Sequence, residues 1–503
     1  MAKETIKKTN VEWSTNISCF LFSILTFFIR NTWNGLLYQI LVFARILCQN
    51  IVFKMTTTCN CRDAQIVEGI FGEIYPGSFQ SASGDAEYGS ISKDVGSLAP
   101  VKIKSYTLTN NNRMQVVLIT WGATIVSLTC PDKFGSSADV VMGFDDLDSY
   151  MDPNLNLFFG SVLGRCANRI KDGMFSIKDR DFQLSKNDNN VHHLHGGLNG
   201  FGRQVWDGHI DGCTVVMTYL SKDGEEGYPG DVLATVRFKL TPDNRLEISM
   251  RAITSKSTIV NMSHGSYFNL AGHAAGVKEL NKHRISLNCD RWTFADYTDP
   301  VPTGAIRGVG GTVMDLRIPQ ILGDCLSKVP PGDGYDHNFC VLRSWQPGAL
   351  FVARALHPPS GRILEVYSDQ PGVQFYTGGR LPPQTPSDIQ LSYDICPQKQ
   401  EQIEKSVEAE QLEDCYDEII GEGDEDGDEE TFKDYESQPP PILEFIPGKK
   451  HAEYRKHGAF CIQPQNYPNA INHKHFPCSI LRPGQVYYHD LIYKFGVQLG
   501  NYM

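Results

Sequence analysis

Short runs of alternating apolar and polar residues, separated by glycine and proline, make up most of this chain. The run LEISM at residues 246–250 alternates strictly, and β-branched or aromatic residues dominate residues 115–119 and 232–240. A period of two places successive side chains on opposite faces of a strand. Similar runs occupy residues 124–129, 214–220 and 363–367. Few central segments show a helical period, so the pattern predicts an all-β fold, a large antiparallel sandwich or barrel.

The net charge of −12 is concentrated in one part of the chain. Residues 401–436 hold seventeen acidic and two basic residues and carry −15, so the rest of the 503 residues carries +3. Nucleic-acid binding requires a basic stripe. The near-neutral remainder therefore excludes a nucleic-acid partner and is compatible with a neutral ligand.

Composition divides the chain into segments. Residues 1–55 are an apolar leader with a 13-residue run at residues 17–29, shorter than the roughly 20 residues that span a membrane. An extraneous leader, a membrane anchor and a secretory signal all remain open, and Met55 offers an alternative start. Residues 56–98 are predicted to form an N-terminal arm and a Gly/Ser-rich linker. Residues 99–503 are predicted to form the sandwich.

An acidic, proline-flanked segment interrupts the predicted sandwich at residues 380–456. It contains GDEDGDEE and SQPPP, the composition of a disordered insertion. A solvated loop is the simpler interpretation, and a surface for a protein partner is the alternative.

The fourteen cysteines form no CxxC pair, which predicts reduced thiols, no zinc site and a cytoplasmic protein.

Two runs combine aromatics with amides, hydroxyls and imidazole: VNMSHGSYFNLAG at residues 260–272 and FCIQPQNYPNAIN at residues 460–472. Such runs suit strands with one packed face and one face against a polar ligand. GRCANRI at residues 164–170 adds an amide beside a guanidinium, although a turn stabilised by Asn168 is the better explanation of this motif taken alone. HHLHGG, YDHNFC and QPGVQFYTG follow. Planar donors beside aromatic faces are what a pyranose ring requires.

The order of these motifs resembles the aldose 1-epimerase (galactose mutarotase) family over residues 71–378 and 458–495. That family implies a large antiparallel β-sandwich with a concave sugar-binding cleft. It also implies interconversion of the α and β anomers of a free aldohexose, galactose or glucose, without metal or organic cofactor. By resemblance, sugar-hydroxyl contacts fall to Asn168, Arg169, His195, Asp336 and Gln374.

The two catalytic positions depart from the family. Where the family reads Asn-His-Ser-Tyr-Phe this chain begins His264-Gly265, and where it reads Leu-Glu-Thr-Gln-Asn this chain has Ile462-Gln463. The acid and base positions are therefore Gly265 and Gln463. His264 is a candidate substitute acid, but a shift of one residue along a strand reverses the side chain unless a bulge intervenes.

Three hypotheses follow. The first is a sugar-binding family member with little or no epimerase activity, because the proton carriers are replaced. The second is an active epimerase that uses His264, His193 or Asp336 instead. The third is an interaction protein that works through its acidic insertion. Arg169 is the only cation of the predicted site, which argues against a phosphorylated hexose.

Overall fold

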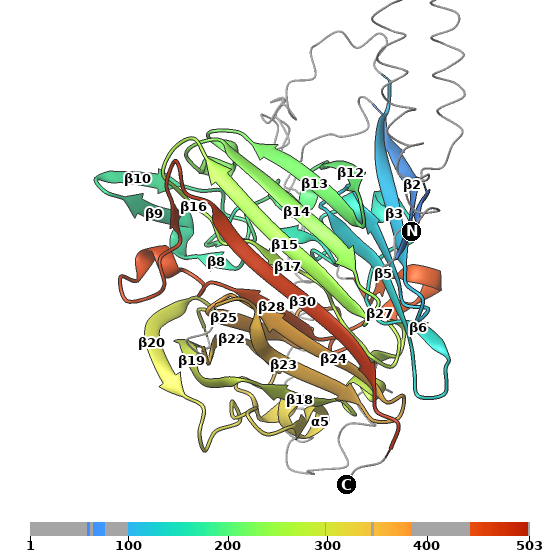
Figure 1. Ribbon diagram of the computed structural model, residues 1–503. Coiled ribbons are helices and arrows are strands. Elements are labelled where there is room, and N and C mark those ends of the chain that lie inside the picture. The colour runs from blue at the N-terminus through green and yellow to red at the C-terminus, as the bar shows by residue number, and fades with distance from the viewer. Residues whose placement is uncertain are drawn as a thin grey trace, which may run out of the picture. The chain divides into compact units, whose positions relative to one another are not determined.

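The computed structural model describes residues 58–60, 64–75, 99–296, 298–343, 347–383 and 443–500. All of them belong to one compact unit, Thr58–Met503, drawn in Figure 1. The predicted leader at residues 1–55 lies outside the described residues. Residues 384–442 of the predicted insertion also lie outside them. Across the described part of the chain, no helix is long and apolar enough to cross a membrane.

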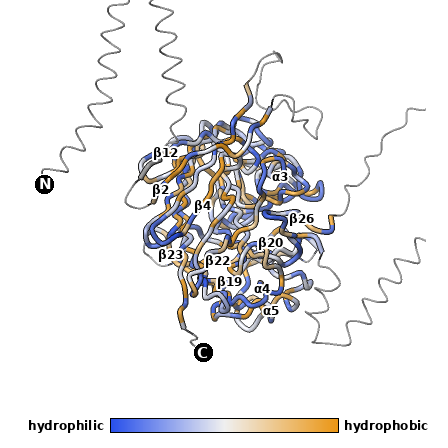
Figure 2. The backbone as a smooth tube through the Cα atoms, turned by 90° about the vertical axis from the view of Figure 1, so that its right-hand side faces the viewer, coloured by the Kyte–Doolittle hydropathy of each residue, from blue (hydrophilic) through white to orange (hydrophobic). Residues whose placement is uncertain are grey.

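The all-β prediction is confirmed. Every run predicted from alternation lies in a strand: β4 (Gln115–Ile119), β5 (Thr124–Pro131), β13 (Thr214–Ser221), β14 (Val232–Leu240), β15 (Arg245–Thr254) and β24 (Arg362–Ser368). The α-helices of the described ranges are single turns: α3 (Leu147–Met151), α4 (Gly276–Leu280) and α5 (Leu322–Cys325). In Figure 2 hydrophobic and hydrophilic residues alternate along individual strands. Strand pairing, rather than helix packing, therefore determines where each motif lies.

A nine-stranded antiparallel sheet crosses the front of the molecule in Figure 1. Its order is β12-β13-β14-β15-β30-β24-β23-β18-β21. The strands not yet defined are β12 (Asp207–Asp211), β30 (Tyr487–Val497), β23 (Leu350–His357), β18 (Arg284–Leu287) and β21 (Gln320–Ile321). In β14, every second residue from Val232 to Leu240 is buried. This alternation gives the sheet one apolar face toward the core.

A five-stranded sheet supplies the opposite wall of the core, in the order β20-β19-β22-β25-β28. Its strands are β20 (Pro302–Gly308), β19 (Cys289–Ala295), β22 (Asp336–Val341), β25 (Gly372–Tyr376) and β28 (Cys461–Gln465). Val373 and Phe375 of β25 belong to the same apolar cluster as Ile248 and Leu491 of the nine-stranded sheet. Gln374, between them in sequence, must point away from that cluster. The five-stranded sheet thus has an apolar face and a polar face.

A six-stranded sheet, β1-β2-β3-β4-β5-β6, contains the first described residues. Its other strands are β1 (Thr58–Asn60), β2 (Gln65–Ile74), β3 (Val101–Thr109) and β6 (Ser137–Asp139). The boundary predicted at residue 99 is therefore wrong, because β2 pairs along β3 and buries Ile66 completely.

The predicted boundaries of the acidic insertion are also too wide. Residues 443–456 contain β26 (Ile446–Pro447) and β27 (Glu453–Tyr454). Between these strands, the buried Lys449 Nζ donates to Asp139 Oδ2 at 2.6 Å and to the carbonyls of Val126 and Val141 at 2.7 and 2.9 Å. A buried ammonium requires such partners, so this segment is attached to the sandwich.

One cysteine also departs from prediction: seven described cysteines are free, but Cys213 forms a disulfide.

We expect Lys449→Ala to destabilise the protein by about 3–5 kcal/mol, because it leaves the Asp139 carboxylate without its buried partner. Urea unfolding followed by fluorescence measures the change. Lys102→Ala, at an exposed lysine of β3, is the control and should stay within about 0.5 kcal/mol of the parent. Equal stability of the two variants would show that Lys449 does not anchor the segment.

Candidate functional site

Four charged side chains form a continuous chain of ion pairs, here called the charge chain. Arg169, in β8 (Arg169–Ile170), places Nε 2.7 Å from Asp188 Oδ2 and Nη2 3.7 Å from Asp336 Oδ2. The other oxygen of Asp188 lies 3.1 Å from Nη1 of Arg380. The order is therefore Asp336, Arg169, Asp188, Arg380. Arg169 and Asp188 are only 4% and 6% exposed, so each requires the other's charge.

The charge chain keeps both carboxylates ionised. Burial raises the pKa of Asp188, but the guanidiniums of Arg169 and Arg380 outweigh burial and bring it below its ordinary value. The pKa of Asp336 is lowered in the same way, against burial, by Arg169 and then Arg380. Both aspartates are hydrogen-bond acceptors at neutral pH and have little basicity.

Asp336 joins the charge chain to the polar face of the five-stranded sheet. Gln374 Nε2 donates to Asp336 Oδ1 at 2.7 Å. Gln374 is the register partner of Asn338 in β22 and of Gln463 in β28. Since register partners in neighbouring strands share a face, these three amides form a row beside the carboxylate.

Several buried amide atoms on this face have no hydrogen-bond partner among the described residues. They are Gln374 Oε1, Asn338 Oδ1, and both Oε1 and Nε2 of Gln465. The side chains of Gln374, Asn338 and Gln465 are 4%, 3% and 0% exposed. Buried polar atoms are nearly always hydrogen-bonded, so an exception indicates bound water or a ligand. These four are among fourteen such atoms in the described ranges, and on this face they offer hydrogen bonds to water or to a polar ligand.

Asn168 and His195 support each other next to Arg169. The Asn168 amide donates to His195 Nδ1 at 3.1 Å, and the His195 amide donates to the Asn168 carbonyl at 3.2 Å. Both residues have a left-handed backbone conformation, with φ of 65° for Asn168 and 54° for His195. Burial, and then the charge of Arg169, lower the pKa of His195 to about 3. The imidazole is therefore neutral and, because Nδ1 accepts, carries its proton on Nε2.

The structure thus brings the five predicted sugar-contact residues into two connected groups. Arg169, Asp336 and Gln374 form one group. Asn168 and His195 form the other, which adjoins the first because Asn168 directly precedes Arg169 in the sequence. The ring of Phe158 lies 5.1 Å from that of His195 and adds an aromatic face.

The prediction that Arg169 is the site's only cation is wrong, because Arg380 belongs to the same charge chain. Neither this residue nor Asp188 could be identified from the sequence motifs. The two pair across 192 positions and belong to no recognised motif. Phe158 was missed as well, although it precedes GRCANRI by only a few residues.

Gly265, the position predicted for the acid, has no room for a side chain. A Cβ added there would lie 2.6 Å from the Phe158 carbonyl oxygen, a backbone atom. Hydrogen bonds fix both sides of this glycine: its amide donates to the Ser161 carbonyl, and its carbonyl accepts from the Gly160 amide, both at 2.9 Å. The position therefore contributes only backbone to the site.

His264 lies inside the core. It belongs to β17 (Ser263–His264), which pairs with β7 (Val162–Leu163), and its ring lies 6.3 Å from Phe238 and 6.2 Å from Tyr493. Both aromatics come from the nine-stranded sheet, on the apolar side. Burial, and then the charge of His489, lower the pKa of His264 to about 3. The structure gives this neutral, enclosed imidazole no route to a ligand on the polar face.

His193 is also engaged elsewhere: Nε2 lies 2.7 Å from the Tyr228 hydroxyl and Nδ1 2.7 Å from the Ser185 carbonyl. Of the three candidate substitutes, only Asp336 lies on the polar face. No group of three or more metal-ligating side chains occurs in the ranges that the structure describes.

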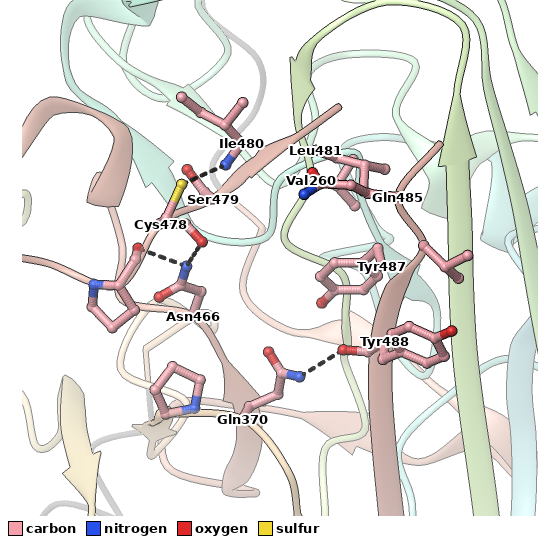
Figure 3. Close-up of a pocket in the computed structure, with 13 residues that line it drawn as sticks. Val260, Gln370, Asn466, Cys478, Ser479, Ile480, Leu481, Gln485, Tyr487 and Tyr488 are labelled. Atoms are coloured by element: carbon pink, nitrogen blue, oxygen red, sulfur yellow. Dashed lines mark hydrogen bonds between the residues drawn. The ribbon is translucent and has the colours of Figure 1, made fainter. Parts of the chain in front are cut away.

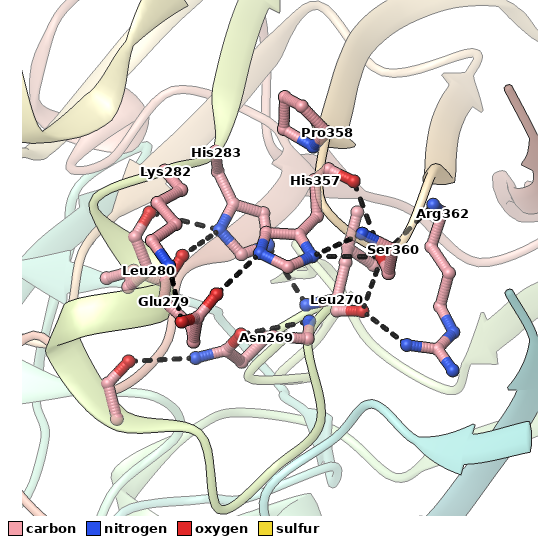
Figure 4. Close-up of polar contacts among 12 residues, drawn as sticks. Asn269, Leu270, Glu279, Leu280, Lys282, His283, His357, Pro358, Ser360 and Arg362 are labelled. Carbon is pink, nitrogen blue, oxygen red and sulfur yellow. Dashed lines mark hydrogen bonds and ion pairs between the residues drawn. The ribbon is translucent and has the colours of Figure 1, made fainter. Parts of the chain in front are cut away.

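A second polar cluster has the order of a nucleophile, a base and an acid (Figure 4). His357 Nδ1 lies 2.9 Å from Ser360 Oγ, and His357 Nε2 lies 3.0 Å from Glu279 Oε2. Ser360 is only 9% exposed, and its hydroxyl also accepts from the Arg362 amide at 3.2 Å. The cluster therefore serves to fasten the turn between β23 and β24.

A cavity of about 590 Å³ lies beside β29 (Ile480–Leu481) and the start of β30 (Figure 3). It is lined by Gln370, Asn466 and Tyr487 among others, and by none of the predicted site residues. Gln370 donates to the Tyr488 carbonyl at 3.1 Å and Asn466 to the Pro477 carbonyl at 3.0 Å. Its amides thus hold loops together, and the cavity is separate from the polar face.

Comparison with known proteins places these features in a family. The family model described as aldose 1-epimerase matches residues 104–494. The galactose mutarotases of Bos taurus and Homo sapiens are each 34% identical over 412 residues, covering 82% of this chain and 98% of theirs. A solved structure of a GalM/aldose epimerase homologue from C. elegans is similar with a TM-score of 0.60 and 23% identity. It covers 77% of this chain and 97% of that one, and supports the fold.

The buried imidazoles predict loss of stability in acid. The pKa values of His195 and His264 are about 3 and that of His193 about 4 in the folded protein, against 6.5 in the unfolded chain. The stability that these groups contribute is complete above pH 6.5 and is lost as the pH falls toward 4. The slope is about 1.4 kcal/mol per pH unit for each such group. Urea unfolding at pH 7.5 to 4.5 measures it, and His264→Gln should give a shallower slope than the parent. An unchanged slope would mean that His264 is not neutral in the fold.

Proposed function

Because the chain belongs to the aldose 1-epimerase family, we propose that it binds a free aldohexose at the charge chain and the polar face, with interconversion of the anomers lost or strongly impaired. Galactose is the first candidate ligand, since the named relatives are galactose mutarotases, and glucose is the second. We also propose a cytoplasmic location, on the ground that free thiols predominate among the described cysteines.

The observation that carries the proposal is a neutral site with unsatisfied polar atoms. Two guanidiniums and two carboxylates cancel in charge, and the buried amide oxygens beside them have no partner in the described part of the chain. A sugar hydroxyl both donates and accepts hydrogen bonds, so it can satisfy an amide oxygen and a guanidinium at once. A charged ligand would be repelled by the two groups of the charge chain that carry the same sign of charge.

Impaired catalysis follows from the chemistry of the two substituted positions. Ring opening requires a base that takes the proton of the C1 hydroxyl and an acid that protonates the ring oxygen. The amide of Gln463 can hydrogen-bond that hydroxyl but cannot hold its proton, and Gly265 offers no side chain. Each general acid or base typically supplies about 10²- to 10⁴-fold in rate. Loss of both leaves little advantage over the spontaneous reaction.

An active epimerase is the second candidate function. It is supported by the alignment with galactose mutarotases over 98% of their length. In that case Asp336 would act as the base, because it is the one proposed substitute on the polar face. Its lowered pKa makes it a weak base, so the expected rate is low.

Calorimetric titration and polarimetry separate these functions. With D-galactose or D-glucose we expect saturable heat, and with freshly dissolved α-D-galactose a rate of rotation close to that of buffer alone. Asp336→Asn should weaken binding about tenfold or more, since a hydrogen bond to a charged group contributes about 1.5–3 kcal/mol. Asp179→Asn, at an exposed aspartate, is the control. Absence of saturable heat with both sugars would refute sugar binding, and rapid mutarotation abolished in Asp336→Asn would favour the active enzyme.

The base position should be the easier one to restore. Gln463→Glu places a carboxylate beside Gln374 without a change in size, and we expect it to accelerate mutarotation by about 10²-fold or more. Gln463→Ala is the matched control and should leave the rate at that of the parent. Adding Gly265→His should give no further gain, because its Cβ meets the Phe158 carbonyl, and should lower the urea midpoint. If Gln463→Glu is no faster than Gln463→Ala, Gln463 does not lie at the C1 hydroxyl.

A further inference from the structure

Arg380 lies at the end of the charge chain, and its side chain is 45% exposed. We propose that it is a ligand-binding residue of this site, one that donates hydrogen bonds to a hydroxyl of a neutral sugar while Asp188 holds it in position. This inference rests on the proposed function and adds to it a residue that no motif of the sequence identifies.

The two side chains of the Arg380–Asp188 ion pair differ in their exposure to solvent. Arg380 is 45% exposed, whereas its partner Asp188 is 6% exposed and is also bound to Arg169. A guanidinium has five N–H donors in a rigid plane. The contact with Asp188 uses Nη1, which leaves the N–H groups on Nε and Nη2 for a ligand.

Arg380 also lies close to the residues of the polar face. Its charge lowers the pKa of Asp336, and the charge of Asp336 in turn raises the pKa of Arg380. The Arg380 amide donates to the Tyr376 hydroxyl at 2.8 Å, and Tyr376 is the register partner of Asp336. The Arg380 backbone is therefore attached to the strand that pairs with Asp336, and its guanidinium reaches the charge chain at Asp188.

The backbone around Arg380, residues 378–383, is fixed on both sides. The Leu381 amide donates to the Gly378 carbonyl at 3.2 Å, and the Pro382 carbonyl accepts from the Lys456 amide at 2.6 Å. The Gly378 carbonyl also accepts from the His457 amide at 3.2 Å. A ligand that binds Arg380 would therefore meet a preorganised donor, which reduces the entropy lost on binding.

The charge of Arg380 also determines which sugars fit. Without it, Arg169 alone would face two carboxylates and the site would carry −1. With it, the four charges cancel. Asp188 and Asp336 still oppose a negative group on the ligand, so the site favours a neutral aldohexose over a sugar acid.

Titration of matched variants with D-galactose tests this role. Arg380→Met keeps the length and apolar stem of the side chain but removes charge and donors, and we expect its Kd to rise about tenfold or more. Arg380→Lys keeps the charge opposite Asp188 but loses the planar fork, and we expect a rise of at least about threefold with an unfolding midpoint equal to that of the parent. Arg180→Met, at an exposed arginine of β10 (Arg180–Gln183), should leave the Kd unchanged.

A second measurement separates ligand contact from a structural role. Saturating galactose should slow hydrogen exchange in residues 378–383 of the parent at least about threefold, and should not do so in Arg380→Met. If the parent binds no sugar, the proposed function fails and this inference fails with it. If the parent binds while Arg380→Lys binds as tightly, or if exchange in residues 378–383 is unaffected by galactose, only the role of Arg380 is overturned.

Discussion

The geometry of the candidate site depends on a buried arginine. Arg169 is 4% exposed and is tolerable there only because carboxylates lie on two sides of its guanidinium. Those carboxylates come from separate parts of the chain, Asp188 ahead of the HHLHGG motif and Asp336 at the start of β22. Neutralising one buried charge therefore requires three separate segments of the chain to meet, and their meeting creates a surface of paired donors and acceptors.

The same strands build the core and the site. Val373 and Phe375 pack against the nine-stranded sheet, while Gln374 between them faces the opposite way and binds Asp336. Because strand side chains alternate, the apolar packing that stabilises the five-stranded sheet also fixes its amides. The positions of the polar groups are thus as rigid as the core, which is the requirement for a binding site whose hydrogen bonds are directional.

Sequence periodicity was sufficient for the fold and for part of the site. Alternation located six strands, and motif order located Arg169, Asp336 and Gln374, because both are local properties of the chain. Arg380 and Asp188 could not be found in this way, since their pairing is a product of tertiary folding across 192 positions. The ends of the acidic insertion were misplaced for a similar reason: composition shows that a segment is polar, but not that Lys449 is buried against Asp139.

Gly265 and Gln463, the positions predicted for the acid and the base, differ in their surroundings. Gln463 differs from a glutamate only in its amide nitrogen, and its surroundings on β28 accommodate a side chain of that size. At Gly265 the Phe158 carbonyl occupies the space that a Cβ would need, and hydrogen bonds from both neighbouring segments keep it there. The first change alters a functional group, whereas the second is built into the backbone. A histidine at residue 265 would therefore require a change in the backbone, whereas a glutamate at residue 463 would require only a change of side chain.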